Sequence, residues 1–159
     1  MPRLLARLIR ILARLILRVW FRVEVRGSFP ERLPEKLVVV ANHQSLLDGP
    51  LLFAFLPFEP TYVVHTQIWA KWYFRLVLST VRSVVVDAAR PQAIRTLVHE
   101  IEHGERVVIF PEGRATVTGS LMKIYDGPAF LAAKTGAAVL PISIDGLVVL
   151  MISSFLRTR

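Results

Sequence analysis

A histidine and an aspartate five positions apart have the residue types and the spacing to do chemistry. His43 and Asp48 come shortly after an apolar run that ends at Ala41. An imidazole can take the proton of an attacking hydroxyl group, and a carboxylate on its second nitrogen fixes the tautomer and stabilises the imidazolium. The two side chains would not share one face of a regular helix, so the pair requires a loop between them. The alternative is structural: Asp48 caps the helix that begins before Pro50, and His43 is an ordinary loop histidine.

A second polar segment, residues 110–114, follows another apolar run. Gly113 permits a close backbone approach, Arg114 offers a planar fork for a phosphate, and Glu112 can accept a hydrogen bond from a hydroxyl group. The alternative is a polar loop with one salt bridge. Further donors suited to a phosphate or a lipid headgroup follow at Thr116, Thr118, Ser120 and Lys123.

Short buried strands must position these residues. Residues 36–41 and 106–110 are β-branched apolar runs, and each is followed by one of the two polar segments. In open α/β sheets, ligands bind beyond the carboxyl ends of the strands. Both segments are therefore expected at one rim of a sheet.

Strands and helices alternate along most of the chain. Pro91 and Gly104 are typical start and stop signals for one of the helices. The alternation predicts an α/β fold with a mostly parallel or mixed sheet flanked by helices. We expect one domain over residues 27–159, truncated at its carboxyl end, because the apolar segment 147–156 stops without a cap. The expected strands are 36–41, 62–64, 83–86, 106–110 and 138–144, and the expected helices are 48–56, 67–78, 91–103 and 128–134.

The first 26 residues carry most of the formal net charge of +8, with seven arginines and one glutamate. On a helical projection six of these arginines fall within an arc of about 120°, and the residues between them are apolar. Charges inside this stretch argue against a membrane-spanning helix and against a secretory signal peptide. We expect an amphipathic helix on a membrane surface, with its arginines at the headgroups and its apolar face in the acyl region; the alternative is a helix docked on its own domain. The expected membrane-binding residues are Arg3, Arg7, Arg10, Arg14, Arg18 and Trp20.

Composition excludes several other classes of protein. A chain of 159 residues with 53% hydrophobic residues can offset the cost of ordering, so a disordered tail is excluded. The absence of cysteine rules out a disulfide framework, a thiol nucleophile and Cys-based zinc sites. Because the basic residues gather in one segment instead of spreading over a folded face, we expect no nucleic-acid partner.

Two further patterns have plainer explanations. His99-Glu-Ile-Glu-His103 matches the zinc-protease motif, but both histidines fall opposite the apolar face of their helix, so a solvated helix face explains them better and no metal is expected. Apolar residues at helical spacing usually pack in the core. The functional alternative is that they line an acyl groove or contact lipid headgroups. Here these residues are Trp69, Trp72, Tyr73 and Leu76, and the nearby His65 is expected to be structural.

Taken together, the motifs resemble those of the glycerolipid (lysophospholipid) acyltransferase family over residues 21–146. The stretch 110–127 resembles more specifically the acyltransferase domain of the bifunctional 2-acylglycerophosphoethanolamine acyltransferase/acyl-ACP synthetases. Asn42-His43 with Asp48 is similar to the first family signature, Phe110–Gly113 to the third, and Val139–Ile142 to the fourth.

The resemblance implies that His43 is the general base and Asp48 its partner, while Glu112, Gly113 and Arg114 bind the glycerophospho group. No cofactor is implied. Two places depart from the family pattern. The arginine of the third signature is usually one position later, at Ala115, and residues 80–87 offer Arg82 early and Asp87 late in place of the usual glycine and arginine.

We therefore expect transfer of an acyl group from acyl-ACP or acyl-CoA to a lysophospholipid hydroxyl, in phospholipid synthesis or repair. The resemblance favours lysophosphatidylethanolamine as acceptor, acyl carrier protein as donor, the cytoplasmic face of the inner (plasma) membrane, and a downstream acyl-ACP synthetase domain. Two alternatives stay open: a catalytically degenerate, membrane-bound lipid-binding module and a thioester hydrolase.

Overall fold

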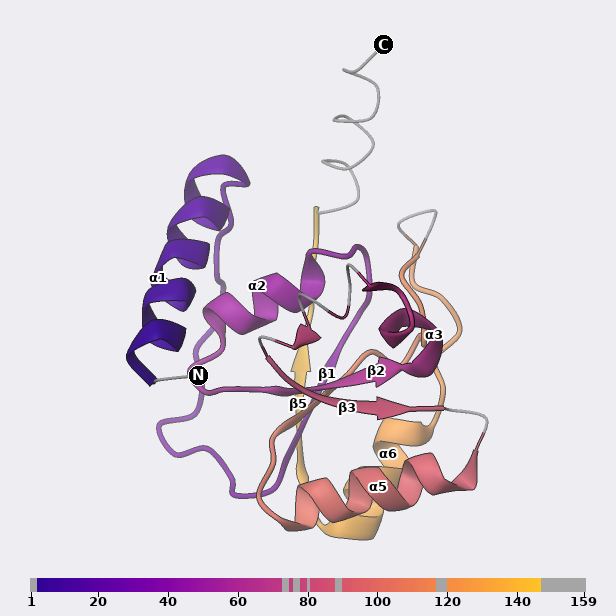
Figure 1. The fold of residues 1–159 in the computed structure, drawn as a ribbon. Helices are drawn as coiled ribbons and strands as arrows, with labels where there is room; N and C mark the ends of the chain where they lie inside the picture. Colours follow the sequence, from indigo (N-terminus) through magenta and orange to yellow (C-terminus); the bar gives the residue numbers. More distant parts are fainter. Residues whose placement is uncertain are drawn as a thin grey trace.

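The computed structural model describes residues 3–72, 75, 78–79, 81–87, 90–116 and 120–146. In this part of the chain a five-stranded sheet lies between helices on both of its faces (Figure 1). The strands are β1 (Leu37–Ala41), β2 (Thr61–His65), β3 (Arg82–Val86), β4 (Val107–Ile109) and β5 (Ala138–Ile142). The helices are α1 (Arg3–Trp20), α2 (Asp48–Phe55), α3 (Thr66–Trp69), α5 (Pro91–Glu102) and α6 (Gly127–Thr135).

The strand order is β3-β2-β4-β1-β5, and every described pair is parallel. β1 lies between β4 and β5, so that Val39 is opposite both Val108 and Leu140. The expected α/β fold is confirmed. Because β1 and β4 are parallel neighbours, the polar segments that follow them reach the same rim of the sheet.

Both faces of the sheet are covered, which explains the continuous apolar runs of its strands. Successive side chains of β1 alternate between the two faces. Leu37 and Val39 belong to the core beneath α2, whereas Val38 belongs to the core beneath α5 and α6. The two cores therefore support the loops that follow the carboxyl ends of the strands.

The helix expected at 67–78 is interrupted, because α3 already ends at Trp69. His65 caps the start of α3 by accepting a hydrogen bond from the backbone N–H of Gln67 at 3.1 Å, so it has the structural role expected of it. Trp72 was expected to pack in the core. That prediction is wrong, because 73% of this residue is exposed. The expectations for Tyr73, Leu76, Thr118 and segment 147–156 lie outside the described residues.

α1 packs against α2 (Figure 1), and arginine side chains of α1 make part of this contact. Arg14 Nε donates to the carbonyl oxygen of Ala54 at 2.6 Å, and Arg10 Nη2 donates to that of Phe58 at 3.1 Å. The last carbonyls of a helix lack intrahelical partners and form the negative end of its dipole, which favours an arginine there. Arg10 and Arg14 thus contact residues 54–58, at and just beyond the carboxyl end of α2, and their expected role at lipid headgroups stays a prediction.

The apolar face of α1 points away from the domain. Two residues mark the face of α1 that packs on the domain. Arg18 Cζ lies 5.6 Å from the ring centroid of Phe55, and Leu17 is buried. None of the described helices is both long and apolar enough to cross a bilayer. The exposed apolar face consists of Leu8, Ile9, Ile11, Leu12, Leu15, Ile16, Val19 and Trp20.

Candidate active site

The loop between β1 and α2 brings His43 and Asp48 together. β1 ends at Ala41 and α2 begins at Asp48, so the pair is separated by a turn and not by a helix. His43 Nδ1 lies 2.7 Å from Asp48 Oδ2. The pairing predicted from the spacing is therefore present.

Asp48 is fully buried, with 0% of its side chain exposed. Its Oδ2 atom also accepts from the backbone N–H groups of Gln44 at 2.7 Å and Ser45 at 2.9 Å. A buried carboxylate requires such donors, and these hold it in one position. With Nδ1–H donating to the carboxylate, Nε2 of His43 carries the lone pair that can take a proton. The His43 side chain is 20% exposed, which leaves it accessible.

The ring of Phe110 stacks on the imidazole of His43. Their centroids are 4.2 Å apart and their planes differ by 21°. Phe110 follows β4, so the neighbouring strand fixes the ring from a second side. Sequence reasoning treated Phe110 only as part of a motif; the signal that could have found this contact is an aromatic residue at the end of a strand adjacent to β1.

Glu112 ties the loops after β1 and β4 together. Its two carboxylate oxygens accept from the backbone N–H groups of His43 at 2.8 Å and Met122 at 3.0 Å, and only 4% of the residue is exposed. The backbone N–H of Thr116 in turn donates to the carbonyl oxygen of His43 at 2.8 Å. The two polar segments expected at one rim are thus in direct contact, and the binding of a glycerophospho group by Glu112 stays a prediction.

Asn42 forms hydrogen bonds with the segment after β5, at the same rim of the sheet. Its amide group donates to the carbonyl oxygen of Ile144 at 2.8 Å and accepts from the N–H of Ile144 at 2.7 Å. This side chain therefore continues the pairing of β1 and β5 beyond the ends of the two strands. Sequence reasoning did not assign it a role, because the partner lies 102 residues away.

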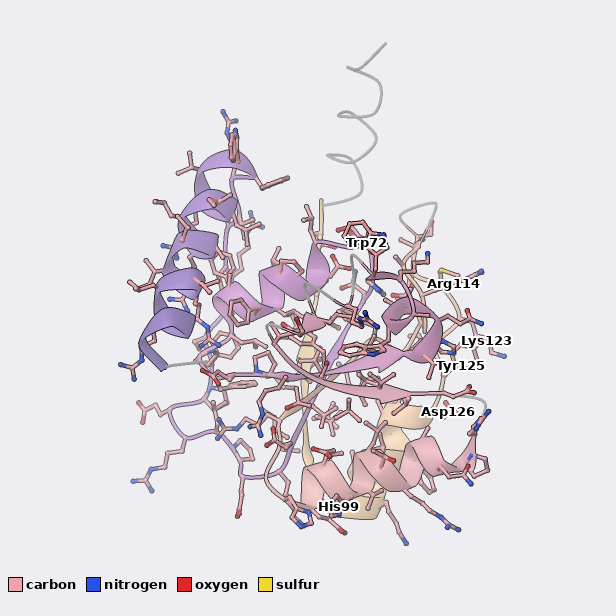
Figure 2. The ribbon with its side chains drawn as sticks, in the orientation of Figure 1. Trp72, His99, Arg114, Lys123, Tyr125 and Asp126 are labelled. Carbon is pink, nitrogen blue, oxygen red and sulfur yellow. The ribbon has the colours of Figure 1, made fainter. Side chains whose placement is uncertain are left out.

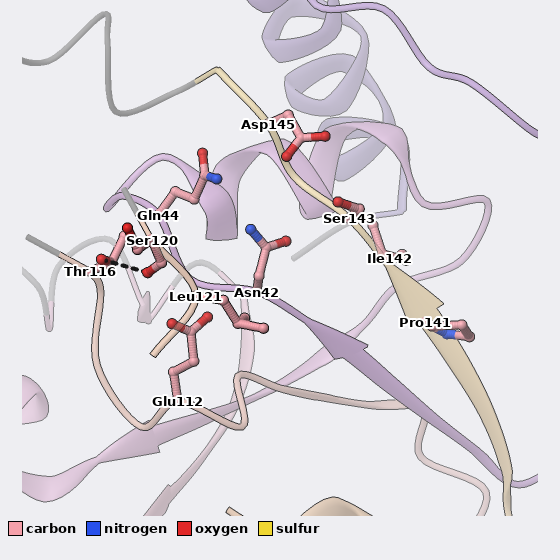
Figure 3. Close-up of a pocket in the computed structure, with 10 residues that line it drawn as sticks. All are labelled: Asn42, Gln44, Glu112, Thr116, Ser120, Leu121, Pro141, Ile142, Ser143 and Asp145. Carbon is pink, nitrogen blue, oxygen red and sulfur yellow. Dashed lines mark hydrogen bonds between the residues drawn. The ribbon is translucent and has the colours of Figure 1, made fainter. Parts of the chain in front are cut away.

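A cavity of about 540 Å³ opens between these loops (Figure 3). It adjoins the pair of His43 and Asp48, hereafter the dyad, through Asn42 and Gln44, the residues on either side of His43. Of the site residues expected from the sequence, Glu112 and Thr116 line it. The full lining is Asn42, Gln44, Glu112, Thr116, Ser120, Leu121, Pro141, Ile142, Ser143 and Asp145.

The expected cationic residues lie outside this lining. Arg114 and Lys123 are exposed at the periphery of the molecule (Figure 2), and Lys123 Nζ lies 5.2 Å from the ring centroid of Tyr125. Gly113 has φ +69°, a conformation that favours glycine, in the turn between them and β4. Arg82, at the amino end of β3, pairs with Glu105 at 2.6 Å and is far along the strand from the carboxyl rim.

A second cavity, of about 840 Å³, lies on the side of α2. Apolar side chains from the segment after α1, from α2 and from β5 contribute to it, including Phe29, Phe55 and Leu140. The two cavities share four lining residues, Pro141, Ile142, Ser143 and Asp145. The cavity beside His43 and the cavity beside α2 thus meet at the end of β5.

The zinc-protease pattern lies on the exposed face of α5, as expected. The rings of His99 and His103 are 4.0 Å apart, and His103 Nδ1 lies 2.7 Å from the carbonyl oxygen of His99. No group of three potential metal ligands occurs among the residues that the structure describes. A solvated helix face therefore accounts for both histidines.

Comparison with known proteins decides the family. The pattern of the family described as "Acyltransferase" matches residues 22–145. This chain belongs to the acyltransferase family. The match covers β1 to β5 and with them both polar segments of the rim.

Two curated relatives are similar over most of this chain. The 1-acyl-sn-glycerol-3-phosphate acyltransferase of Pseudomonas aeruginosa is 33% identical over 76% of this chain and 48% of its own length. The chloroplastic 1-acyl-sn-glycerol-3-phosphate acyltransferase of Arabidopsis thaliana is 30% identical over 73% of this chain and 34% of its own length. The chain therefore spans half or less of these relatives.

The crystal structure of the 1-acyl-sn-glycerophosphate acyltransferase PlsC from Thermotoga maritima superposes with a TM-score of 0.70. The sequences are 26% identical, and the match covers 90% of this chain and 58% of that one. The acyltransferase fold is thus shown, whereas the narrower resemblance to the bifunctional enzymes stays a prediction.

Proposed function

We propose that this chain transfers an acyl group from a thioester to the hydroxyl group of a lysophospholipid. The observation that carries the proposal is the contact of 2.7 Å between His43 Nδ1 and the fully buried carboxylate of Asp48. Acyltransferase family membership and the names of the relatives, which act on 1-acyl-glycerol phosphates, support the same reaction.

The dyad supplies a general base for a weak nucleophile. Nε2 of His43 takes the proton of the acceptor hydroxyl while its oxygen attacks the carbonyl carbon of the thioester. The new C–O bond forms, the C–S bond breaks, and the imidazolium returns the proton to the departing thiolate. Asp48 stabilises the imidazolium during this sequence. General base catalysis of this kind contributes about 10²- to 10⁴-fold to the rate.

The two adjoining cavities fit the two ends of a lysophospholipid. In the proposed complex the cavity beside His43 takes the glycerol and headgroup, and the larger cavity beside α2, which Phe29, Phe55 and Leu140 line, takes an acyl chain. Arg114, which is two residues beyond Glu112, and Lys123 remain available for phosphates of the acceptor or of the donor. The sequence resemblance favours lysophosphatidylethanolamine as acceptor, acyl carrier protein rather than CoA as donor, and a neighbouring acyl-ACP synthetase domain as partner.

The exposed apolar face of α1 supports attachment to a membrane, where lysophospholipids reside. An apolar face flanked by cations is typical of helices that lie in the lipid interface. Arg7 and Arg18 are exposed at the borders of this face, and we expect them to meet anionic headgroups. The sequence resemblance favours the cytoplasmic face of the inner membrane.

Acyl transfer by the His43→Ala variant tests the mechanism. Radiolabelled acyl-CoA and acyl-ACP are each offered with a lysophospholipid, and His99→Ala, on the exposed face of α5, is the matched control. We expect His43→Ala to lower kcat at least about 100-fold with an unchanged melting temperature, and the control to keep wild-type activity. Unchanged transfer by His43→Ala would disprove the mechanism. Release of free fatty acid without an acceptor would indicate a hydrolase, and vesicle binding without turnover of either donor would indicate a lipid-binding module.

A further inference from the structure

Arg22 has a backbone conformation that glycine usually adopts. Its φ is 50°, and among the described residues all others with a positive φ are glycines. It lies two positions after α1, where the backbone N–H groups of Phe21 and Val23 both donate to the carbonyl oxygen of Leu17, at 3.1 and 3.3 Å. In Figure 1 the chain turns back here and runs alongside α1. A side chain in this conformation crowds the backbone, so an arginine at this position costs stability that a glycine would not.

The side chain of Arg22 has no protein partner that offsets this cost. It makes no hydrogen bond, ion pair or ring contact in the part of the chain that the structure describes. It is exposed, and it lines the larger of the two cavities, the one beside α2. A strained residue with an unpaired cation beside a cavity indicates a role in binding.

The cavity beside α2 has two arginines and two acids in its described lining. Arg26 pairs with Glu24 at 3.2 Å, through side chains that are 89% and 74% exposed. Asp145 is exposed and forms no ion pair with Arg22. Arg22 is therefore the unpaired cation of this lining. Because apolar side chains of α2, of β5 and of the segment after α1 also line the cavity, it suits a ligand with an acyl chain and an anionic group.

The cations that the sequence resemblance associates with a phosphate lie elsewhere. Arg114 and Lys123 line neither cavity. Arg82 is engaged in an ion pair at the amino end of β3. Among the described residues, Arg22 and Arg26 are the cations that line the two joined cavities.

We propose that Arg22 binds the phosphate group of a lipid whose acyl chain occupies the cavity beside α2. The inference rests on the proposed function, which places an acyl chain there, and adds the residue that holds the phosphate. A guanidinium donates parallel N–H groups to phosphate oxygens, and its charge strengthens these hydrogen bonds. The lysophospholipid acceptor and a phospholipid of the bilayer both carry this group. An acceptor bound in this way has its phosphate where the two cavities meet and its glycerol beside His43.

Two amphiphiles that differ only in the phosphate test the site without requiring turnover. 1-Decanoyl-sn-glycerol 3-phosphate and 1-decanoyl-sn-glycerol are titrated as monomers into the full chain by calorimetry. We expect the phosphate to strengthen binding about tenfold, as suits charge-assisted hydrogen bonds at an exposed site. Arg22→Gly should reduce this ratio to about two, and Arg22→Lys, which keeps the charge, should give an intermediate ratio. Arg95→Gln, which removes an exposed cation on α5, is the control and should keep the ratio.

Urea unfolding separates binding from a role in the fold. Arg22→Gly should unfold at a urea concentration no lower than that of wild type, because glycine adopts the left-handed conformation without strain. A lower midpoint would overturn the proposal, since the arginine side chain would then serve the fold.

Sedimentation with vesicles of phosphatidylethanolamine and phosphatidylglycerol identifies the source of the phosphate. A lower amphiphile ratio in Arg22→Gly supports the proposal with the acceptor as the bound lipid. An unchanged ratio with about fivefold weaker vesicle binding supports it with a bilayer phospholipid as the bound lipid. No change in either measurement would overturn it. Binding that depends on Arg22, without transfer to any acceptor, would contradict the proposed function and support the phosphate site.

Discussion

The carboxylate of Asp48 has two separable roles. Its negative charge faces the imidazole of His43, and its Oδ2 atom also closes the loop by accepting from the backbone N–H groups of Gln44 and Ser45. The first role concerns the reaction and the second the fold of the loop. Two substitutions at this one position can therefore distinguish them.

Asp48→Asn keeps an oxygen acceptor but removes the charge, whereas Asp48→Ala removes both. We expect Asp48→Asn to lower kcat about 100-fold while the free energy of unfolding stays within about 1 kcal/mol of wild type. Asp48→Ala should also lower the free energy of unfolding by roughly 2–4 kcal/mol, because buried backbone N–H groups lose their acceptor. Steady-state kinetics and urea unfolding measure the two effects. Equal stability of the two variants would show that the backbone contacts contribute little.

At the scale of elements, α2 connects the dyad to the rest of the fold. Its first turn is held by the hydroxyl of Tyr62 in β2, which donates to the carbonyl oxygen of Gly49 at 2.8 Å. Its last turn is held by Arg14 of α1. The helix that carries Asp48 is thus fixed at both ends by different elements.

Burial raises the pKa of Tyr62 above its ordinary value of 10.0, and this predicts a loss of stability at alkaline pH. Above pH 10 the unfolded chain releases the phenolic proton while the folded chain keeps it, so the free energy of unfolding falls as pH rises, by about 1.4 kcal/mol per pH unit. Below pH 10 the contribution is fully present. Tyr62→Phe should lose about 1 kcal/mol at pH 8 through the missing hydrogen bond but show a shallower alkaline decline.

Urea unfolding at about pH 8 and pH 11 measures this difference. Tyr125→Phe is the control, because Tyr125 is exposed and its phenol is in contact with solvent. The same decline in Tyr62→Phe as in wild type would show that other groups cause the alkaline loss.

The sequence was sufficient for the elements that depend on local pattern. The β-branched run at 36–41 predicted a buried strand, which the structure has at 37–41, and the rule that ligands bind at strand carboxyl ends placed His43 and Glu112 at one rim. The sequence was insufficient where a contact with a residue far along the chain determines the position of a side chain. The contact of Asn42 with Ile144 depends on β5 lying beside β1, and the direction of Arg14 depends on free carbonyls at the end of α2. Helical periodicity shows which residues share a face of α1 but not which face packs.

At the scale of the whole molecule, the orientation of α1 decides which surface is offered to a membrane. Arg10 and Arg14 are turned inward onto α2, so the outward face is apolar, with Leu12 57% and Leu15 59% exposed. Contact with lipid would therefore rest on apolar burial, with the arginines at the borders adding electrostatic attraction. The arginine face packed on α2 would contribute to folding instead.

Binding to vesicles separates these two contributions. In sedimentation with vesicles of phosphatidylethanolamine and phosphatidylglycerol, the double variant Leu12→Gln/Leu15→Gln should partition on the order of 100-fold less than wild type, since each buried leucine contributes about 1.5–3 kcal/mol. Arg14→Gln, the control on the opposite face, should keep its partition within a few-fold while losing about 1 kcal/mol of stability, because α2 loses the cation at its carboxyl end. The reverse pattern, with binding lost in Arg14→Gln and kept in the leucine variant, would mean that α1 turns its arginine face to the lipid and must leave α2 to do so.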